Sequence, residues 1–146
     1  MASLVDTNIL VYCCDPRDSA KRSAAASVLR QGVASGEMRI PHQALVEFVS
    51  AVTRNRGAAG PLLTRENATR QAEMFMAEFP VLYSNAQVFR TALWGMAAYQ
   101  LSWFDAHLWA YAEHFGLAEI LSEDFEHGRI YGTVRIQNPF VASGLE

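Results

Sequence analysis

The stretch Ala2-Ser3-Leu4-Val5-Asp6-Thr7-Asn8-Ile9-Leu10-Val11-Tyr12 decides the fold of this chain. The apolar run that ends at Val5 is interrupted by three polar residues, and apolar residues resume at Ile9. This pattern predicts a buried strand that turns directly into a helix. Asp6 then lies at the carboxyl end of the strand, where open parallel sheets bind their ligands.

Outward from this stretch, helical and strand patterns alternate along the chain. Small and apolar residues recur with helical spacing over 19–33 and 43–53, from Thr64 onward, and over 84–100 and 102–115. Gly36 closes the first of these predicted helices, Met74 and Phe75 lie on the apolar side of the helix after Thr64, and Ser102 opens the last helix with a capping box. Short apolar runs at 38–41, 80–83, 118–121 and 133–136 are typical of strands. Strands separated by helices predict an α/β fold, a three-layer α/β/α sandwich with a central parallel sheet.

The length of the chain predicts one domain over residues 1–146. A chain of 146 residues has the usual size of a single domain. The loop at 57–61 resembles a linker but is too short to divide domains. We therefore expect one hydrophobic core region, supported by a hydrophobic fraction of 51%.

Composition also narrows the classes of function. The net charge of −3 argues against a broad cationic face for nucleic acid, so a polyanionic substrate would have to be held locally. Apart from Lys21, the residues that are positively charged at pH 7 are arginines, whose planar guanidinium can donate two hydrogen bonds to a phosphate. No apolar run approaches the roughly 20 residues that span a bilayer, and the N-terminus lacks the features of a secretory signal. We therefore expect a cytoplasmic protein that makes no membrane contact.

The two cysteines are adjacent in the sequence. An unstrained disulfide between Cys13 and Cys14 is not expected, and no other cysteine can pair with either. No Cys-x-x-Cys motif or neighbouring histidine supports a metal site. We interpret both as reduced, partly buried packing residues.

Four acidic residues are the candidates for chemistry. Asp6 and Asp124 each follow a predicted strand, Asp105 begins a helix, and Glu47 can reach the same sheet edge from its own helix. Each also has a structural interpretation, as a helix cap, a solvated side chain or a turn residue. The apolar neighbours of Asp6 and Asp105 favour function, because an isolated carboxylate in such surroundings is unfavourable unless it is compensated.

Convergence of these carboxylates would call for a cation. Their mutual repulsion would disfavour ionisation unless a metal neutralises them. Oxygen ligands without cysteine or a histidine cluster select a hard ion such as Mg²⁺ or Mn²⁺. One or two such ions can activate water and stabilise the oxygens of a phosphodiester during hydrolysis.

Four stretches carry a resemblance to a known family, in order and with matching spacing. They are Leu4-Val5-Asp6-Thr7-Asn8, Leu45-Val46-Glu47-Phe48, Trp103-Phe104-Asp105-Ala106 and Leu121-Ser122-Glu123-Asp124-Phe125. With these motifs the chain resembles a PIN-domain ribonuclease, specifically a VapC-like toxin of a type II toxin–antitoxin pair. The resemblance extends over essentially the entire chain, through the segment at 134–140.

The resemblance implies an endoribonuclease that depends on Mg²⁺ or Mn²⁺. It implies that Asp6, Glu47, Asp105 and Asp124 coordinate the metal and activate water. It also implies a cognate VapB-like antitoxin and a homodimer as partners, and RNA as substrate. The supporting residues that orient the acids or the metal-bound water are Thr7, Asn8 and Ser122.

Several other residues have two interpretations each. Glu123 can supplement Asp124 or point to solvent. Arg54 and Arg56 can contact RNA phosphates or be solvated charges at a helix end. We interpret His107 and His114 as helix-surface residues. The aromatic and methionine residues of the last two long helices are expected mainly in the core, with one or two available for a dimer face or an antitoxin groove: Trp94, Met96, Tyr99, Trp103, Phe104 and Trp109.

Three alternative functions share parts of this pattern. A catalytically degenerate PIN-fold interaction module would keep the acids as caps, and a metal-dependent DNA nuclease would use the same chemistry on DNA. A phosphoaspartate protein would also place Asp6 after a first strand. That class needs a lysine late in the chain or a second aspartate two residues on, whereas this chain has only Lys21 and has Asn8 at that position.

Overall fold

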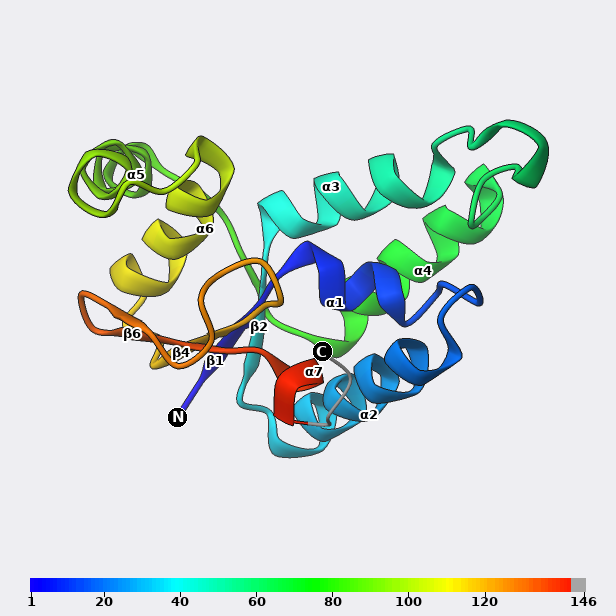
Figure 1. Cartoon of the computed structure of the whole chain (residues 1–146), viewed down its shortest axis with the longest axis horizontal. Coiled ribbons are helices and arrows are strands. Elements are labelled where there is room, and N and C mark those ends of the chain that lie inside the picture. The colour runs from blue at the N-terminus through cyan, green and yellow to red at the C-terminus, as the bar shows by residue number, and fades with distance from the viewer. Residues whose placement is uncertain (143–146) are drawn as a thin grey trace.

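The computed structural model describes residues 1–142, and the last four residues of the predicted single domain, 143–146, lie outside this part. The chain alternates short strands with longer helices (Figure 1). The strands are β1 Ser3–Val5, β2 Met38–Pro41, β3 Val81–Leu82, β4 Glu119–Leu121, β5 Ile130–Tyr131 and β6 Val134–Gln137. The helices are α1 Thr7–Tyr12, α2 Ser19–Ser35, α3 His42–Thr53, η1 Gly57–Ala59, α4 Arg65–Glu78, α5 Ala86–Tyr99, α6 Trp103–His114 and α7 Pro139–Ala142.

The six strands form one sheet in the order β3-β2-β1-β4-β6-β5. All neighbouring pairs are parallel except β5 and β6, which pair antiparallel with Ile130 opposite Arg135. The predicted parallel sheet is therefore confirmed for five strands. β5 was not predicted, because a two-residue strand beside a turn is too short to show an alternating pattern.

Residues alternate between the two faces of the sheet, and each face has its own core. Val5 and Leu121 pack with α1 to α4 and α7, whereas Leu4, Ile120 and Ile136 pack with α5 and α6. Figure 1 shows α5 and α6 on one side of the strands and the other helices on the opposite side. This arrangement is the expected three-layer sandwich.

The boundaries of the helices follow local signals. Asp18 caps α2 by accepting a hydrogen bond from the backbone N–H of Lys21, and Gly36 ends the same helix with a φ of 69°. Ser102 caps α6 in the same way, by accepting from the backbone N–H of Asp105. The predicted capping by Ser102 and termination by Gly36 are thus confirmed.

The expected core assignment of the aromatic residues on α5 and α6 is only partly correct. Trp109 is buried, and Gly95 allows it a close approach, since a Cβ at Gly95 would lie 2.4 Å from the Trp109 ring. Trp94 and Phe104 are instead 59% and 63% exposed. Helical spacing cannot assign them correctly, because α6 is apolar around most of its circumference and only one side meets the sheet.

Within the described residues, no helix combines the length and apolar character needed to cross a membrane. Cys13 and Cys14 are free thiols whose Sγ atoms are 3.7 Å apart.

Candidate active site

The carboxyl ends of β1 and β4 lie side by side and place Asp6 next to Ser122. Because the two strands pair in parallel, with Val5 opposite Leu121, the residues that follow them emerge at the same edge. Asp6 begins α1, accepting a hydrogen bond from the Thr7 backbone N–H at 2.6 Å. The Ser122 hydroxyl donates to Asp6 Oδ2, also at 2.6 Å. The Asp6 side chain is therefore held from two directions in a position that is only 7% exposed.

Asn8 joins Asp6 to Asp124. Its Nδ2 lies 3.3 Å from Asp6 Oδ2 and 3.1 Å from Asp124 Oδ2, and so bridges the two carboxylates. Its Oδ1 is buried and has no hydrogen-bond partner among the described residues. The amide nitrogen is the positive end of a dipole, so it occupies the kind of position that a cation between the two acids would favour.

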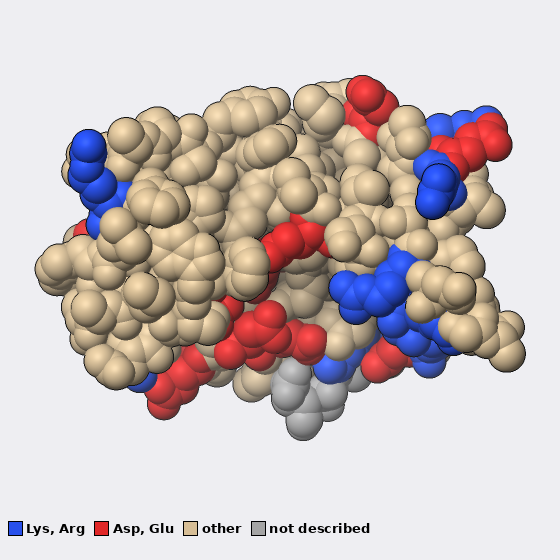
Figure 2. Space-filling model, turned by 90° about the horizontal axis from the view of Figure 1, so that it is seen from above, with Lys and Arg blue, Asp and Glu red and all other residues tan. Residues whose placement is uncertain are grey.

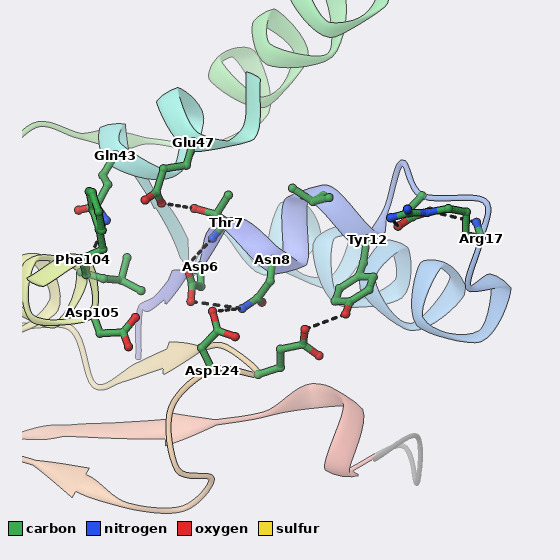
Figure 3. A pocket seen from close by; sticks show the side chains of 14 residues that line it. Asp6, Thr7, Asn8, Tyr12, Arg17, Gln43, Glu47, Phe104, Asp105 and Asp124 are labelled. Atoms are coloured by element: carbon green, nitrogen blue, oxygen red, sulfur yellow. Dashed lines mark hydrogen bonds and ion pairs between the residues drawn. The ribbon is translucent and has the colours of Figure 1, made fainter. Parts of the chain in front are cut away.

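Glu47 and Asp105 reach the same edge from two helices. Glu47 of α3 accepts a hydrogen bond from the Thr7 hydroxyl at 2.7 Å. Asp105 lies in the first turn of α6, where its own backbone N–H donates to the Ser102 hydroxyl. Figure 3 shows both carboxyl groups directed toward the space above Asp6. All four predicted acids line one cavity of about 370 Å³, and we call them the acidic centre: Asp6, Glu47, Asp105 and Asp124.

The acidic centre is electrostatically unfavourable without a cation. Burial raises the pKa of Asp6 to about 7, and the charges of Asp124 and Asp105 add to the increase, while hydrogen bonds from Ser122 and Thr7 oppose it. Burial also raises the pKa of Asp105, with further contributions from Asp124 and Glu47. Ionisation of the centre would therefore be promoted by a positive charge placed between these groups.

The chemistry of the side-chain atoms in the acidic centre fits a hard divalent cation. It consists of carboxylate oxygens with a neighbouring amide and hydroxyl, and contains no sulfur or imidazole. In their present rotamers the described residues include no group of three acidic, histidine or cysteine side chains that could hold one ion together. A small rotation of the exposed Asp124 side chain, away from the amide of Asn8, is the adjustment that this geometry suggests.

A second set of side chains lies along the outer part of the same cavity, and its members are paired. We call it the paired rim: Tyr12, Asp15, Arg17 and Glu123, which line the cavity, and Lys21, which pairs with Glu123. Glu123 accepts a hydrogen bond from the Tyr12 hydroxyl at 2.7 Å and forms an ion pair with Lys21 at 3.0 Å. The solvated position offered for Glu123 is wrong, since its side chain is 18% exposed and is neutralised by Lys21. A role in supplementing Asp124 stays a prediction.

Asp15 and Arg17 form the other pair of the rim. The guanidinium of Arg17 donates from Nε and Nη2 to the two carboxylate oxygens of Asp15, at 2.9 and 2.7 Å. These bonds lower the pKa of Asp15 below its usual value. Figure 2 shows the resulting surface, with acidic side chains in a central hollow and a basic cluster on one side of it.

The remaining candidates lie outside the acidic centre. Arg54 is exposed and does not line the cavity, whereas Arg56 is half-buried and donates to the carbonyl of Ala51 at 3.0 Å. His107 is not a simple surface residue, because it is half-buried and its Nδ1 lies 2.6 Å from Gln43 Oε1. Gln43 itself lines the cavity one helical turn before Glu47, and this i, i+4 spacing is the signal that could have identified it.

Comparisons with known structures agree with the fold. VapBC2 from Rickettsia felis, bound to a DNA fragment from their promoter, matches with a TM-score of 0.70 and 12% identity, over 94% of this chain and 98% of that chain. A toxin–antitoxin complex from Klebsiella pneumoniae gives 0.68 and 17% identity, over 94% and 98% of the two chains. VapC20 from Mycobacterium tuberculosis, a sarcin–ricin loop cleaving toxin, gives 0.64 and 17% identity, over 84% and 90%.

The sequence comparisons give the family. No curated protein matches the chain. The family model for the PIN domain matches residues 3–132, which include all four acids and both supporting residues that contact Asp6 and Asp124, namely Asn8 and Ser122. This chain therefore belongs to the PIN domain family, as its four sequence motifs had indicated.

Proposed function

We propose that this protein is a metal-dependent endoribonuclease that hydrolyses RNA phosphodiester bonds. The observation that carries the proposal is the acidic centre itself. Among the described residues, the side chains that hydrogen-bond its members are Thr7, Asn8, Ser102 and Ser122, all of them neutral. Four carboxylates that converge without an internal cation are well suited to hold Mg²⁺ or Mn²⁺.

The residues of the cavity have two proposed roles, metal binding and orientation of the metal ligands. Asp6, Glu47, Asp105 and Asp124 would hold the metal, which when bound polarises a phosphodiester oxygen and makes water a better nucleophile. Thr7 orients Glu47, while Ser122 and Asn8 orient Asp6 and Asp124. The raised pKa of Asp6 means that metal binding and loss of its proton are coupled.

We further propose that the enzyme acts as the toxin of a toxin–antitoxin pair, with a VapB-like antitoxin as partner and a homodimer as its assembly. The structural similarity to toxin–antitoxin complexes supports the antitoxin. An exposed apolar strip on α5, formed by Phe89, Leu93 and Met96, supports a protein contact of the kind that a homodimer needs. Arg54 and Arg56 stay predicted RNA contacts, at the end of the helix that carries Glu47.

Cleavage of RNA by the purified protein, freed of any antitoxin, tests the enzymatic proposal. We expect cleavage on addition of Mg²⁺ or Mn²⁺ and none with a chelator. Asp6→Asn should abolish it, because the amide keeps a capping oxygen but removes the metal-binding charge. Glu66→Gln is the matched control, since Glu66 is an exposed acid on α4 that pairs with Arg70 and does not line the cavity.

The same assay separates the alternative functions. Equal cleavage of single-stranded DNA of the same sequence would favour a DNA nuclease. Absence of cleavage together with unchanged stability on adding Mg²⁺ or Mn²⁺ would favour a degenerate interaction module. Metal-independent cleavage by Asp6→Asn would contradict the mechanism itself.

A further inference from the structure

Phe104 differs from the other exposed aromatic residues of the described chain. Its side chain is 63% exposed, more than Tyr83, Phe89, Trp94 or Phe115. Each of those four has an aromatic or imidazole ring as neighbour, whereas Phe104 has none among the described residues. Most of a large apolar ring is therefore exposed at the edge of an acidic cavity.

The position of Phe104 is fixed by its surroundings. It precedes Asp105 in the first turn of α6, and its carbonyl accepts a hydrogen bond from Gln43 Nε2 at 3.3 Å. This hydrogen bond joins α6 to α3, the helix that carries Glu47. Figure 3 shows the ring at one end of the cavity, beside Gln43 and Asp105. Such a ring loses little conformational freedom when a flat ligand stacks on it.

Arg17 lies at the other end of the cavity (Figure 3). Among the described residues that line the cavity, it is the one lysine or arginine. Its backbone N–H, Nε and Nη2 all donate to Asp15, which fixes the guanidinium, and the side chain is still 57% exposed. A preoriented guanidinium with an accessible outer edge is a good contact for phosphate.

We propose that the cavity binds one RNA strand across the acidic centre, with an unpaired base stacked on Phe104 and a phosphate further along the strand held by Arg17. This inference rests on the proposed ribonuclease function and assigns it two binding subsites. A paired base inside a helix does not expose its face to a protein ring, so the Phe104 subsite selects nucleotides that are out of the stack. Arg17 supplies the local positive charge that an acidic cavity needs to retain a polyanion.

Binding of a short, unpaired, fluorescently labelled oligoribonucleotide, followed by anisotropy with Ca²⁺ in place of the catalytic ion, tests the stacking subsite. Stacking on one aromatic ring contributes about 1–3 kcal/mol per base, so Phe104→Ala should weaken binding roughly tenfold, and Phe104→Trp should restore it. Phe115→Ala is the control, since Phe115 is also exposed but packs against Tyr111 and does not line the cavity.

Oligoribonucleotides with one base removed at successive positions make this test specific. At the position that meets Phe104, base removal should weaken binding to the wild type but not to Phe104→Ala. An equal loss for both proteins at every position would overturn the stacking subsite. The same strand annealed to its complement should bind the wild type and Phe104→Ala equally.

The salt dependence of the same binding tests the phosphate subsite. Loss of one phosphate contact to a single strand should reduce the slope of log K against log salt by about 0.7 for Arg17→Gln. Arg70→Gln, an exposed arginine outside the cavity, should leave the slope unchanged. The double variant Asp15→Asn with Arg17→Gln removes the ion pair without changing net charge, and it should still show the reduced slope. Recovery of the wild-type slope in that double variant would overturn the role of Arg17.

These outcomes are separable from those of the proposed function. Absence of RNA cleavage by the wild type would overturn the ribonuclease proposal, whatever the binding data show. Cleavage by the wild type with unchanged RNA binding by Phe104→Ala would overturn the Phe104 subsite alone. If Phe104→Ala weakened a co-purified protein partner instead of RNA, the exposed ring would be a protein contact and the inference would be wrong.

Discussion

The acidic centre and the paired rim line the same cavity, yet their carboxylates have opposite surroundings. In the centre, burial and neighbouring acids raise the pKa of Asp6 and of Asp105. In the rim, Arg17 lowers the pKa of Asp15, and Lys21 neutralises Glu123. Positively charged side chains therefore lie beside the carboxylates of the paired rim but not beside those of the acidic centre. This arrangement is expected where an external cation binds.

The largest expected difference between the two regions is in the pH dependence of stability without metal. The pKa of Asp6 is about 7 in the folded protein and near 4 when unfolded, so the folded state binds the proton more tightly between these values. Stability should fall as pH rises from about 4 to 7, by an amount on the order of 4 kcal/mol. Asp6→Asn lacks this proton and should be more stable than the wild type at pH 8, and equally stable near pH 4.

Chemical denaturation in a chelator, at several pH values, measures this difference directly. The quantity of interest is the stability of Asp6→Asn minus that of the wild type, because titrating groups that do not interact with Asp6 then cancel. If Asp6 were only a helix cap, the difference would stay near zero at every pH, because asparagine caps a helix about as well as aspartate does.

Metal binding should distinguish the centre from the rim by a somewhat smaller amount. At a Mg²⁺ or Mn²⁺ concentration 100 times the dissociation constant, the wild type should gain about 2.7 kcal/mol of stability. The gain should be larger at pH 8 than at pH 5.5, because the ion must displace the proton of Asp6. Asp124→Asn should lose the gain and Glu123→Gln should keep it. Loss in both variants would mean that the rim also binds the ion.

Ser122 links Asp6 and Asp124 of the acidic centre to the sheet, and the effect of its substitution should be smaller again. Its fully buried hydroxyl donates to Asp6 and accepts from the backbone N–H of Asp124 at 3.0 Å. Ser122→Ala removes the support of two metal-binding residues without removing charge, so metal affinity should fall about 10- to 100-fold. Isothermal titration with Mn²⁺ measures the change, with Ser35→Ala at the far end of α2 as control. Unchanged affinity would show that Asp6 keeps its orientation without this hydroxyl.

The parts of this structure that the sequence predicted depend on local signals. The strand before Asp6, the cap at Ser102 and the glycine after α2 are each specified by a few adjacent residues. The convergence of Asp6 and Asp124 followed from a general property of parallel sheets, whose carboxyl ends share one edge. Glu47 could be placed by family resemblance but not by periodicity, since its helix also allows a solvated position.

The parts that the sequence did not predict depend on contacts between distant residues. Tyr12 and Lys21 meet Glu123 across more than one hundred positions, so nothing near Glu123 indicates that it is paired. Helical spacing also cannot tell which of two apolar sides meets the sheet. This explains why Met74, expected on the apolar side of α4, is half-exposed while Phe75 beside it is buried.

The paired rim itself should respond least to substitution. Glu123→Gln keeps an oxygen that can accept from the Tyr12 hydroxyl and removes only the charge that faces Lys21. Both side chains of this ion pair are only 18% exposed, so the substitution weakens the compensation of a largely buried Lys21, and the loss of stability should be about 1–2 kcal/mol. A double-mutant cycle with Lys21→Met isolates the pairing, because methionine preserves much of the apolar stem near the rings of Tyr12 and Phe140.

The sign of the change in stability distinguishes the paired rim from the acidic centre. Removing a charge from the rim should destabilise the metal-free protein, whereas removing one from Asp6 should stabilise it at pH 8. Stabilisation by both substitutions would mean that Lys21 does not compensate Glu123, and that the rim belongs electrostatically to the acidic centre.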